Sequence, residues 1–175
     1  MDIQYDNDAI TKIASHFESI IELLGEDKTR EGLKKTPIRA AKALYYATNG
    51  YRKNPTEIMQ QAIFEYAGSK MVIVKDIEFY SFCEHHILPF FGHISIGYIP
   101  NGKVAGLSKL ARTVEVYARR PQLQEQMTDQ IADALMEELG VAGAMVMTEA
   151  EHMCMTMRGI KKPGSQTVSI AVRGK

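Results

Sequence analysis

The chain has 175 residues, enough for one compact domain, and its 45% hydrophobic and 24% charged residues are ordinary for a globular protein. The chain has 21 lysine and arginine residues and 21 aspartate and glutamate residues, so its formal net charge is zero. No overall electrostatic field therefore attracts it to nucleic acid or to a membrane. The N-terminus lacks the features of a signal peptide, and no apolar run approaches the ~20 residues that span a bilayer. Two cysteines without a secretory signal favour a reducing, cytoplasmic location, where metal binding is more common than a disulfide.

Residues 1–67 are expected to form an N-terminal helical region. Apolar residues in the range 10–24 recur at i, i+3, i+4 and i+7 spacing, which predicts a helix with one buried face. A second helix is expected over 36–48, with Thr36 as N-cap and Pro37 at the first helical position. A third is expected to start near residue 55 and to continue towards residue 66.

Residues 68–175 have a different pattern and predict the order β-β-α-α-β-β. β-branched and aromatic residues favour strands, and two amphipathic patterns favour helices between them. The expected strands are 71–82, 93–100, 144–158 and 167–174, and the expected helices are 107–120 and 121–139. The predicted fold class is therefore α+β, with a four-stranded antiparallel sheet and two helices on one face.

The stretch SFCEHHILPFFGH, residues 81–93, contains one of the two cysteines of the chain, an acid and three of its five histidines. Cys83 and His86 are three residues apart, a spacing that lets a tight turn direct both side chains at one ion. His85 should point elsewhere, because neighbouring side chains diverge. A second cysteine, Cys154, also lies beside a histidine, His152, in a segment expected to pair with the first.

Cys83, His86 and Cys154 would make a Cys₂His set with one open position, the arrangement of a catalytic zinc. The alternative is a closed structural Cys₂His₂ site with His152 as fourth ligand. In a continuous strand His152 would lie about 6.6 Å from Cys154, which mildly disfavours the closed site without excluding it. In the same strand the methionines of the HMCMTMR stretch, residues 152–158, would pack into the core.

A cluster of cations favours anion binding at the start of the expected helix 107–120. Ser108 suits an N-cap, and Lys109 and Arg112 are i, i+3 neighbours where free N–H groups and the helix dipole attract phosphate. A solvated basic face is the alternative interpretation. Arg158 would lie about 13 Å along the expected strand from Cys154, a separation that suits an elongated ligand with an anionic tail.

The remaining polar residues are less informative on their own. Gln124 and Glu125 lie early in the following helix, and the pattern does not rank Glu125 above its neighbours. His16 and His93 are expected to be structural or exposed.

Four stretches together resemble the GTP cyclohydrolase I family. They are EGLKKTPIRAAKAL at 31–44, FCEHHILPFFGHISIGYIP at 82–100, VAGLSKLARTVEVYARRPQLQEQMTDQIAD at 104–133 and EHMCMTMRG at 151–159. The likeness covers about residues 29–168, and Pro121 stands where the family usually has an aliphatic residue. It implies the tunnelling fold, in which subunit sheets join into barrels and two rings of five stack into a homodecamer.

The resemblance also implies roles for individual residues. One Zn²⁺ per subunit would be held by Cys83, His86 and Cys154, and proton transfer would involve His85, His152 and Ser108. Glu125 would recognise the guanine edge of GTP with help from Gln124. Ribose and triphosphate would be held by Ser108, Lys109, Arg112 and Arg158, with Arg39 and Lys42 reaching in from a neighbouring subunit. The implied reaction converts GTP to 7,8-dihydroneopterin triphosphate and formate, the first step of pterin and folate synthesis.

Two other interpretations remain open from the sequence. A relative in the same fold superfamily could bind a purine or pterin and perform other chemistry, although a nitrile reductase would need a cysteine that zinc does not occupy. A zinc-stapled oligomeric binding protein could use the same nucleotide pocket without turnover. Loss of turnover on replacing His85, with zinc and GTP binding retained, would distinguish an enzyme from such a binding protein.

Overall fold

The computed structural model describes residues 4–174 and divides the chain into two compact units, residues 1–49 and 50–175. The first unit contains two helices, and the second contains the β-sheet with the remaining helices. Each unit has its own cluster of buried apolar side chains. Within 4–174, no helix is both long and apolar enough to cross a membrane.

The first unit is a pair of helices, α1 (Asn7–Leu23) and α2 (Thr36–Ala47). The carboxylate of Asp6 caps α1 by accepting from two backbone N–H groups of the first turn. Ile10 of α1 and Ala41 and Tyr45 of α2 form the buried cluster of this unit. The prediction of Thr36 as N-cap is wrong by one residue, because Thr36 is already helical and its hydroxyl donates to the carbonyl of Gly32 at 3.2 Å.

The second unit starts with a 3₁₀ turn (η1, Asn49–Arg52) that crosses the boundary, followed by the short helix α3 (Pro55–Gln60). The predicted continuation of this helix towards residue 66 is wrong. Instead β1 (Ile63–Glu65) pairs antiparallel with β4 (Lys103–Ala105). Pairing with a distant strand overrides local helix propensity here.

The main sheet has five strands in the order β5-β2-β3-β6-β7. Its strands are β2 (Val72–Cys83), β3 (Pro89–Ile99), β5 (Pro121–Gln122), β6 (Gly143–His152) and β7 (Gln166–Gly174). β2, β3, β6 and β7 pair antiparallel, as the sequence predicts, and the two-residue β5 adds a short parallel contact to the end of β2. The predicted β-β-α-α-β-β order is present within this unit.

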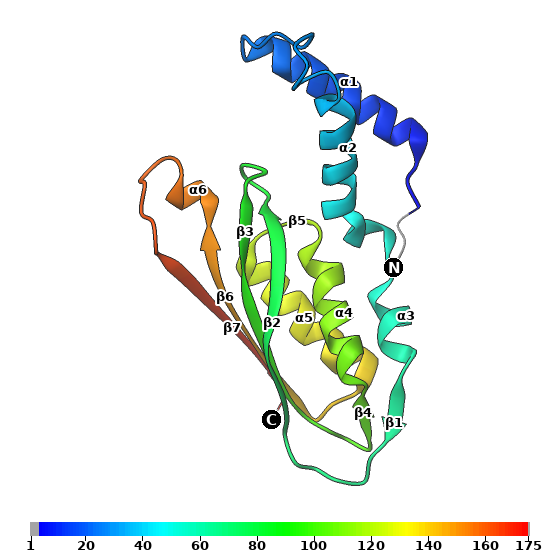
Figure 1. Cartoon of the computed structure of the whole chain (residues 1–175). Coiled ribbons are helices and arrows are strands. Elements are labelled where there is room, and N and C mark those ends of the chain that lie inside the picture. The colour runs from blue at the N-terminus through cyan, green and yellow to red at the C-terminus, as the bar shows by residue number, and fades with distance from the viewer. Residues whose placement is uncertain (1–3, 175) are drawn as a thin grey trace. The chain divides into compact units, whose positions relative to one another are not determined.

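Two helices, α4 (Leu107–Ala118) and α5 (Gln124–Leu139), cover one face of the sheet (Figure 1). α4 contacts β2, and α5 contacts β6 and β7. The core lies between these layers. Its largest fully buried apolar side chains include Phe79, Phe90, Ile94 and Ile96 from the strands and Leu110, Met127, Ile131 and Leu135 from the helices.

The opposite face of the sheet also carries apolar side chains, but these are exposed. Val168, Ile170 and Val172 alternate along β7 with exposed fractions of 52%, 60% and 61%. Met145 of β6, the partner of Val172 in the ladder, continues this face. We call Val168, Ile170, Val172 and Met145 the outer apolar face.

Candidate functional site

Cys83 and His86 lie in a tight turn that joins β2 to β3. Cys83 ends β2, and its backbone N–H donates to the carbonyl of Leu88 while its carbonyl accepts from the N–H of Ile87, both at 2.8 Å. Ile87 has a φ of 54°, which is unfavourable for a β-branched residue and is held by these hydrogen bonds. The turn places Nδ1 of His86 3.7 Å from Sγ of Cys83, as the spacing predicts.

Cys154 comes from a single helical turn, α6 (Met153–Thr156), that follows β6 directly. The predicted strand over 144–158 is therefore wrong beyond His152. The ladder ends there because His152 pairs with Phe90, and the next position of β3 is Pro89, which has no N–H to donate. The strand-based separations expected from Cys154 to His152 and to Arg158 do not apply to a helical turn.

The helical turn also changes the environment of the methionines in this segment. Met157 is 62% exposed, and Met153 and Met155 are only half-buried, so the prediction that they pack into the core is wrong. Burial of Cys154 nevertheless remains substantial, because its side chain packs against the core cluster of the second unit.

The structure brings the three predicted metal ligands together. Within residues 4–174, the ligand atoms of Cys83, His86 and Cys154 form the sole group of three or more whose members all lie within 4.8 Å of one another. Donor atoms around a tetrahedral ion of zinc's size are separated by about 3.5–3.8 Å, so small side-chain adjustments suffice for binding. Cys83 is buried and His86 exposed, which places this Cys-His-Cys group at the edge of the core.

The thiol of Cys154 is affected by its surroundings in this group. Burial raises the pKa of the Cys154 thiol, and the adjacent Cys83 sulfur raises it further. Both cysteines are free. A metal ion bound here would displace the thiol protons, because thiolates are the ligating form.

His152 lies two residues before Cys154 but has other partners. Its ring stacks on Phe90 with centroids 4.6 Å apart and planes 2° apart, and its Nε2 lies 2.7 Å from Oε1 of Gln124. Burial lowers the pKa of His152, and the charge of Glu125 partly opposes this shift. His85 differs from it, because its side chain is exposed in the turn beside His86.

Gln124 and Glu125 begin α5 and differ in their surroundings. Gln124 is 2% exposed, and its amide nitrogen donates to the carbonyls of Thr148 and Thr167 at 3.0 and 2.9 Å. Glu125 is exposed in the first turn, where the positive end of the helix dipole favours a carboxylate. Glu125 is therefore accessible to a ligand, whereas the amide of Gln124 is occupied by protein groups.

The predicted anion-binding residues Ser108, Lys109 and Arg112 lie in the first half of α4. Ser108 is not the N-cap as predicted, because Gly106 takes that position. The ammonium of Lys109 donates to the side-chain oxygen of Gln61 at 2.7 Å.

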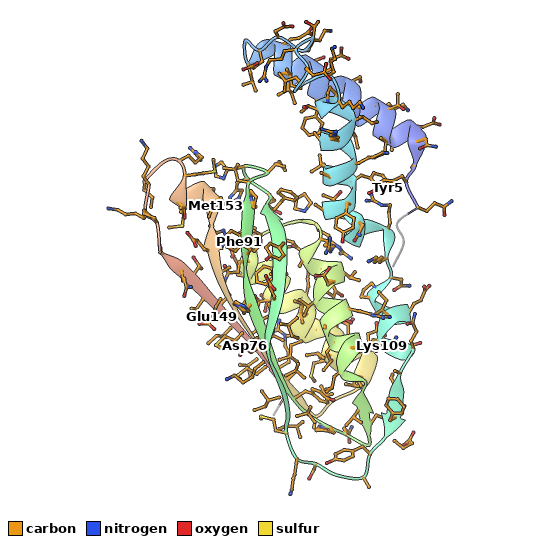
Figure 2. All side chains as sticks on the ribbon, viewed as in Figure 1. Tyr5, Asp76, Phe91, Lys109, Glu149 and Met153 are labelled. Carbon is orange, nitrogen blue, oxygen red and sulfur yellow. The ribbon has the colours of Figure 1, made fainter. Side chains whose placement is uncertain are left out.

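These cations are far from the metal ligands in one chain. α4 ends at Ala118, and the next strand, β5, pairs with Cys83, so the carboxyl end of α4 lies on the metal side. A 12-residue helix is about 18 Å long, which leaves Lys109 at the distant end. Figure 2 shows Lys109 well apart from Met153, the neighbour of Cys154.

The remaining predicted phosphate ligands lie elsewhere. Arg158 is exposed just after α6. Arg39 and Lys42 are exposed on α2 in the first unit, where the Lys42 ammonium lies 5.7 Å from the ring centroid of Tyr5. Phe90, which supports His152, was missed by sequence reasoning; only the apolar run ILPFF beside the histidines indicates that a packed wall adjoins this site.

The fold and the site define an α+β protein with a Cys-His-Cys group near a half-buried histidine, where strands β2 and β6 of the sheet end. The description "GTP cyclohydrolase I" belongs to the family model that matches residues 13–175. GTP cyclohydrolase 1 of Campylobacter lari is 52% identical over 163 residues, which are 93% of this chain and 86% of that protein. GTP cyclohydrolase 1 of Clostridium kluyveri is 56% identical over 163 residues, 93% of this chain and 88% of that protein.

A solved structure shows a related fold at much lower sequence identity. The archaeosine synthase QueF-Like in its apo form is 19% identical with a TM-score of 0.50, and the match covers 63% of this chain and 98% of that one. The family model and the two relatives span most of the chain. The chain therefore belongs to the GTP cyclohydrolase I family of enzymes.

Proposed function

We propose that this enzyme hydrolyses the guanine ring of GTP, releases formate and rearranges the product to 7,8-dihydroneopterin triphosphate, using one zinc ion per subunit. The observation that carries the proposal is the convergence of Cys83, His86 and Cys154 within 4.8 Å, two residues from the half-buried His152, in a member of this family. The reaction would provide the first intermediate of pterin and folate synthesis.

The donor set fits zinc. Two thiolates and one imidazole suit a borderline-soft ion, and three protein ligands are the number typical of a catalytic site that keeps one position open. The alternative closed site with His152 as fourth ligand is disfavoured, because His152 is not among the residues whose ligand atoms converge within 4.8 Å. When bound, zinc supplies a Lewis acid that activates water near neutral pH.

The residues of the chain would orient GTP and move protons. His152 and the exposed His85 would exchange protons with the ring nitrogen that leaves C8, and Ser108 would assist proton transfer at the ribose. The carboxylate of Glu125 would accept hydrogen bonds from the ring N–H and the exocyclic amine of guanine. The triphosphate would be held by Lys109, Arg112, Arg158, Arg39 and Lys42.

We further propose that each active site is shared between subunits. The metal ligands and Lys109 of one chain lie towards opposite ends of α4, which supports a GTP site that takes these two sets of groups from different chains. Both edges of the sheet are also available for pairing: β7 is an edge strand, and β5 covers only the last two residues of β2. Joining such edges would close a barrel, consistent with a homodecamer of two pentamers working in the cytoplasm.

The first test is an assay of purified, zinc-loaded protein with GTP, measuring formate and the fluorescent oxidised pterin. Equal amounts of both products are expected, and removal of zinc by a chelator should abolish both. Cys154→Ser should lose zinc and activity together, while Met155→Leu in the same helical turn should retain both. Formate without pterin would contradict the proposed product, and full activity of the zinc-free protein would contradict the role of zinc.

The second test examines the shared site. Cys154→Ala and Lys109→Ala should each be inactive alone. Random co-assembly at equal amounts should restore activity in about a quarter of the sites, because each site takes its metal ligands from one chain and its Lys109 from another. Mixed oligomers without any activity would show that one chain supplies both.

A further inference from the structure

Gln124 is an unusual residue for the start of a helix, because its polar side chain is 2% exposed and fully engaged. Three polar atoms surround its amide: the carbonyl oxygens of Thr148 and Thr167, and Nε2 of His152. These partners come from β6 and β7, so the amide links α5 to two strands of the sheet. A buried amide with all its hydrogen bonds made has one defined orientation.

That orientation determines where the proton of His152 is. The two carbonyl oxygens at 3.0 and 2.9 Å only accept, so the atom facing them must be the amide nitrogen of Gln124. Its Oε1 therefore faces His152 and can only accept. Nε2 of His152, 2.7 Å away, must then carry a hydrogen and donate it.

A second layer of hydrogen bonds holds Gln124 in place. The hydroxyl of Thr128 donates to the backbone carbonyl of Gln124 at 2.7 Å and lies 2.8 Å from the hydroxyl of Thr148. Thr128 and Thr148 are 1% and 0% exposed. Since Thr128 uses its hydrogen on the carbonyl, the hydroxyl of Thr148 donates to that of Thr128, and the network has one consistent direction.

Phe90 restricts the remaining freedom of the imidazole. The planes of the two rings are almost parallel, at 2°, with centroids 4.6 Å apart, and Phe90 is completely buried. Stacking sets the plane of the His152 ring, and the hydrogen bond to Gln124 sets its rotation within that plane. The imidazole is therefore held at two independent points.

We propose that Gln124 is a positioning residue that holds neutral His152 as the Nε2–H tautomer, leaving Nδ1 as the ring nitrogen that exchanges a proton during the reaction. Its side chain then acts on His152 and not on the guanine edge, which falls to Glu125. The kinetic consequence rests on the function proposed above, whereas the tautomer follows from the hydrogen bonds alone.

The tautomer can be measured in the unmodified protein. Zinc-loaded protein labelled with ¹⁵N-histidine would be sedimented and studied by solid-state NMR at a pH where His152 is neutral. Its signals are identified by their loss in His152→Asn, among only five histidines. A protonated Nε2 with a bare Nδ1 is expected. A protonated Nδ1 would overturn the proposal, whatever the enzyme turns over.

The kinetic test compares two buried glutamines. Gln122→Met is the matched control, because Gln122 is 4% exposed and its amide, among residues 4–174, bonds to the carbonyl of Tyr117 and to Gln130. For GTP turnover, Gln124→Met should lower kcat by about 10- to 100-fold, the usual effect of losing a supporting hydrogen bond, with KM and zinc content retained. Gln122→Met should leave kcat within a factor of about three.

The outcomes separate the possible roles. A raised KM with unchanged kcat in Gln124→Met would mean that the amide binds substrate, and would overturn the proposal. If Gln124→Met does not fold, the NMR measurement on the unmodified protein still decides. If that protein shows the expected tautomer but does not turn over GTP, the proposed function fails while the positioning of His152 stands.

Discussion

Glu125 differs from Gln124 although the two residues are adjacent. The side chain of Gln124 is fixed inside the protein, while the carboxylate of Glu125 is exposed in the first turn of α5. An ionised carboxylate accepts two hydrogen bonds without donating any, which matches the two neighbouring N–H groups on the guanine edge.

Glu125→Gln should therefore impair GTP recognition. The amide presents an N–H group to a donor of guanine, and the mismatch should lower kcat/KM by about 100-fold or more, because sites built on hydrogen bonds discriminate strongly. Steady-state kinetics with GTP would measure the loss. The exposed neighbour Gln126 supplies the control, since Gln126→Ala should keep kcat/KM within about threefold. Unchanged kinetics in Glu125→Gln would exclude this carboxylate from guanine recognition.

At the scale of elements, local patterns predicted well where the determining interactions are local. The turn after β2 follows from the Cys83-His86 spacing, and its hydrogen bonds lie within five residues. Strand alternation held along β6 as far as His152, but the end of β6 depends on Pro89 in the partner strand. The alternating HMCMTMR stretch does not itself indicate where the strand ends, so the helical turn α6 was not predicted.

The role of Gln124 illustrates the limit of local reasoning. Its amide partners lie 24, 28 and 43 residues away, on strands whose register only the folded sheet defines. From the sequence a glutamine at the start of an amphipathic helix is indistinguishable from a solvated one. The family resemblance located the residue and implied that it assists substrate recognition; the contacts of its amide with Thr148, Thr167 and His152 became visible only in the folded structure.

The backbone conformation of Gly140, which ends α5, can be tested by mutation. Gly140 ends the helix with a φ of 63°, and its N–H donates to the carbonyl of Met136. A Cβ added at Gly140 would find no heavy atom of the described residues within 4 Å beyond its chain neighbours, so a side chain would meet conformational strain only. Gly140→Ala should lower the free energy of unfolding by about 1 kcal/mol.

Asparagine provides the matched comparison, because it tolerates left-handed backbone better than alanine. Gly140→Asn should lose less stability than Gly140→Ala in urea unfolding. Equal losses in the two variants would mean that the side chain, and not the backbone conformation, causes the effect.

At the scale of the whole molecule, the outer apolar face bears on the proposed assembly. Val168, Ile170 and Val172 are each more than half exposed on an edge strand, a combination that favours association. In the proposed assembly this strand joins the sheet of the next subunit.

A charge on this face should weaken assembly. Ile170→Glu would place a carboxylate among apolar neighbours, and sedimentation velocity should show smaller species than for the unmodified protein. GTP turnover should fall with it if, as proposed, each active site takes residues from two chains. Lys162→Glu, in the exposed segment before β7, is the control and should leave the sedimentation pattern unchanged. A normal sedimentation pattern for Ile170→Glu would place the contact elsewhere.

The short strand β5 links the turn after β2 to the start of α5. The carbonyl of Gln122 accepts from the N–H of Glu84 in the turn that carries Cys83 and His86, and two residues later the chain enters α5 with Gln124 and Glu125. The turn that carries Cys83 and His86 and the start of α5 are thus both attached to β5, which serves as their common anchor. If zinc orders this anchor, it raises the affinity for guanine nucleotide, and by thermodynamic reciprocity the nucleotide raises the affinity for zinc by the same factor. Scarce zinc would then be retained best by enzyme already occupied by its substrate.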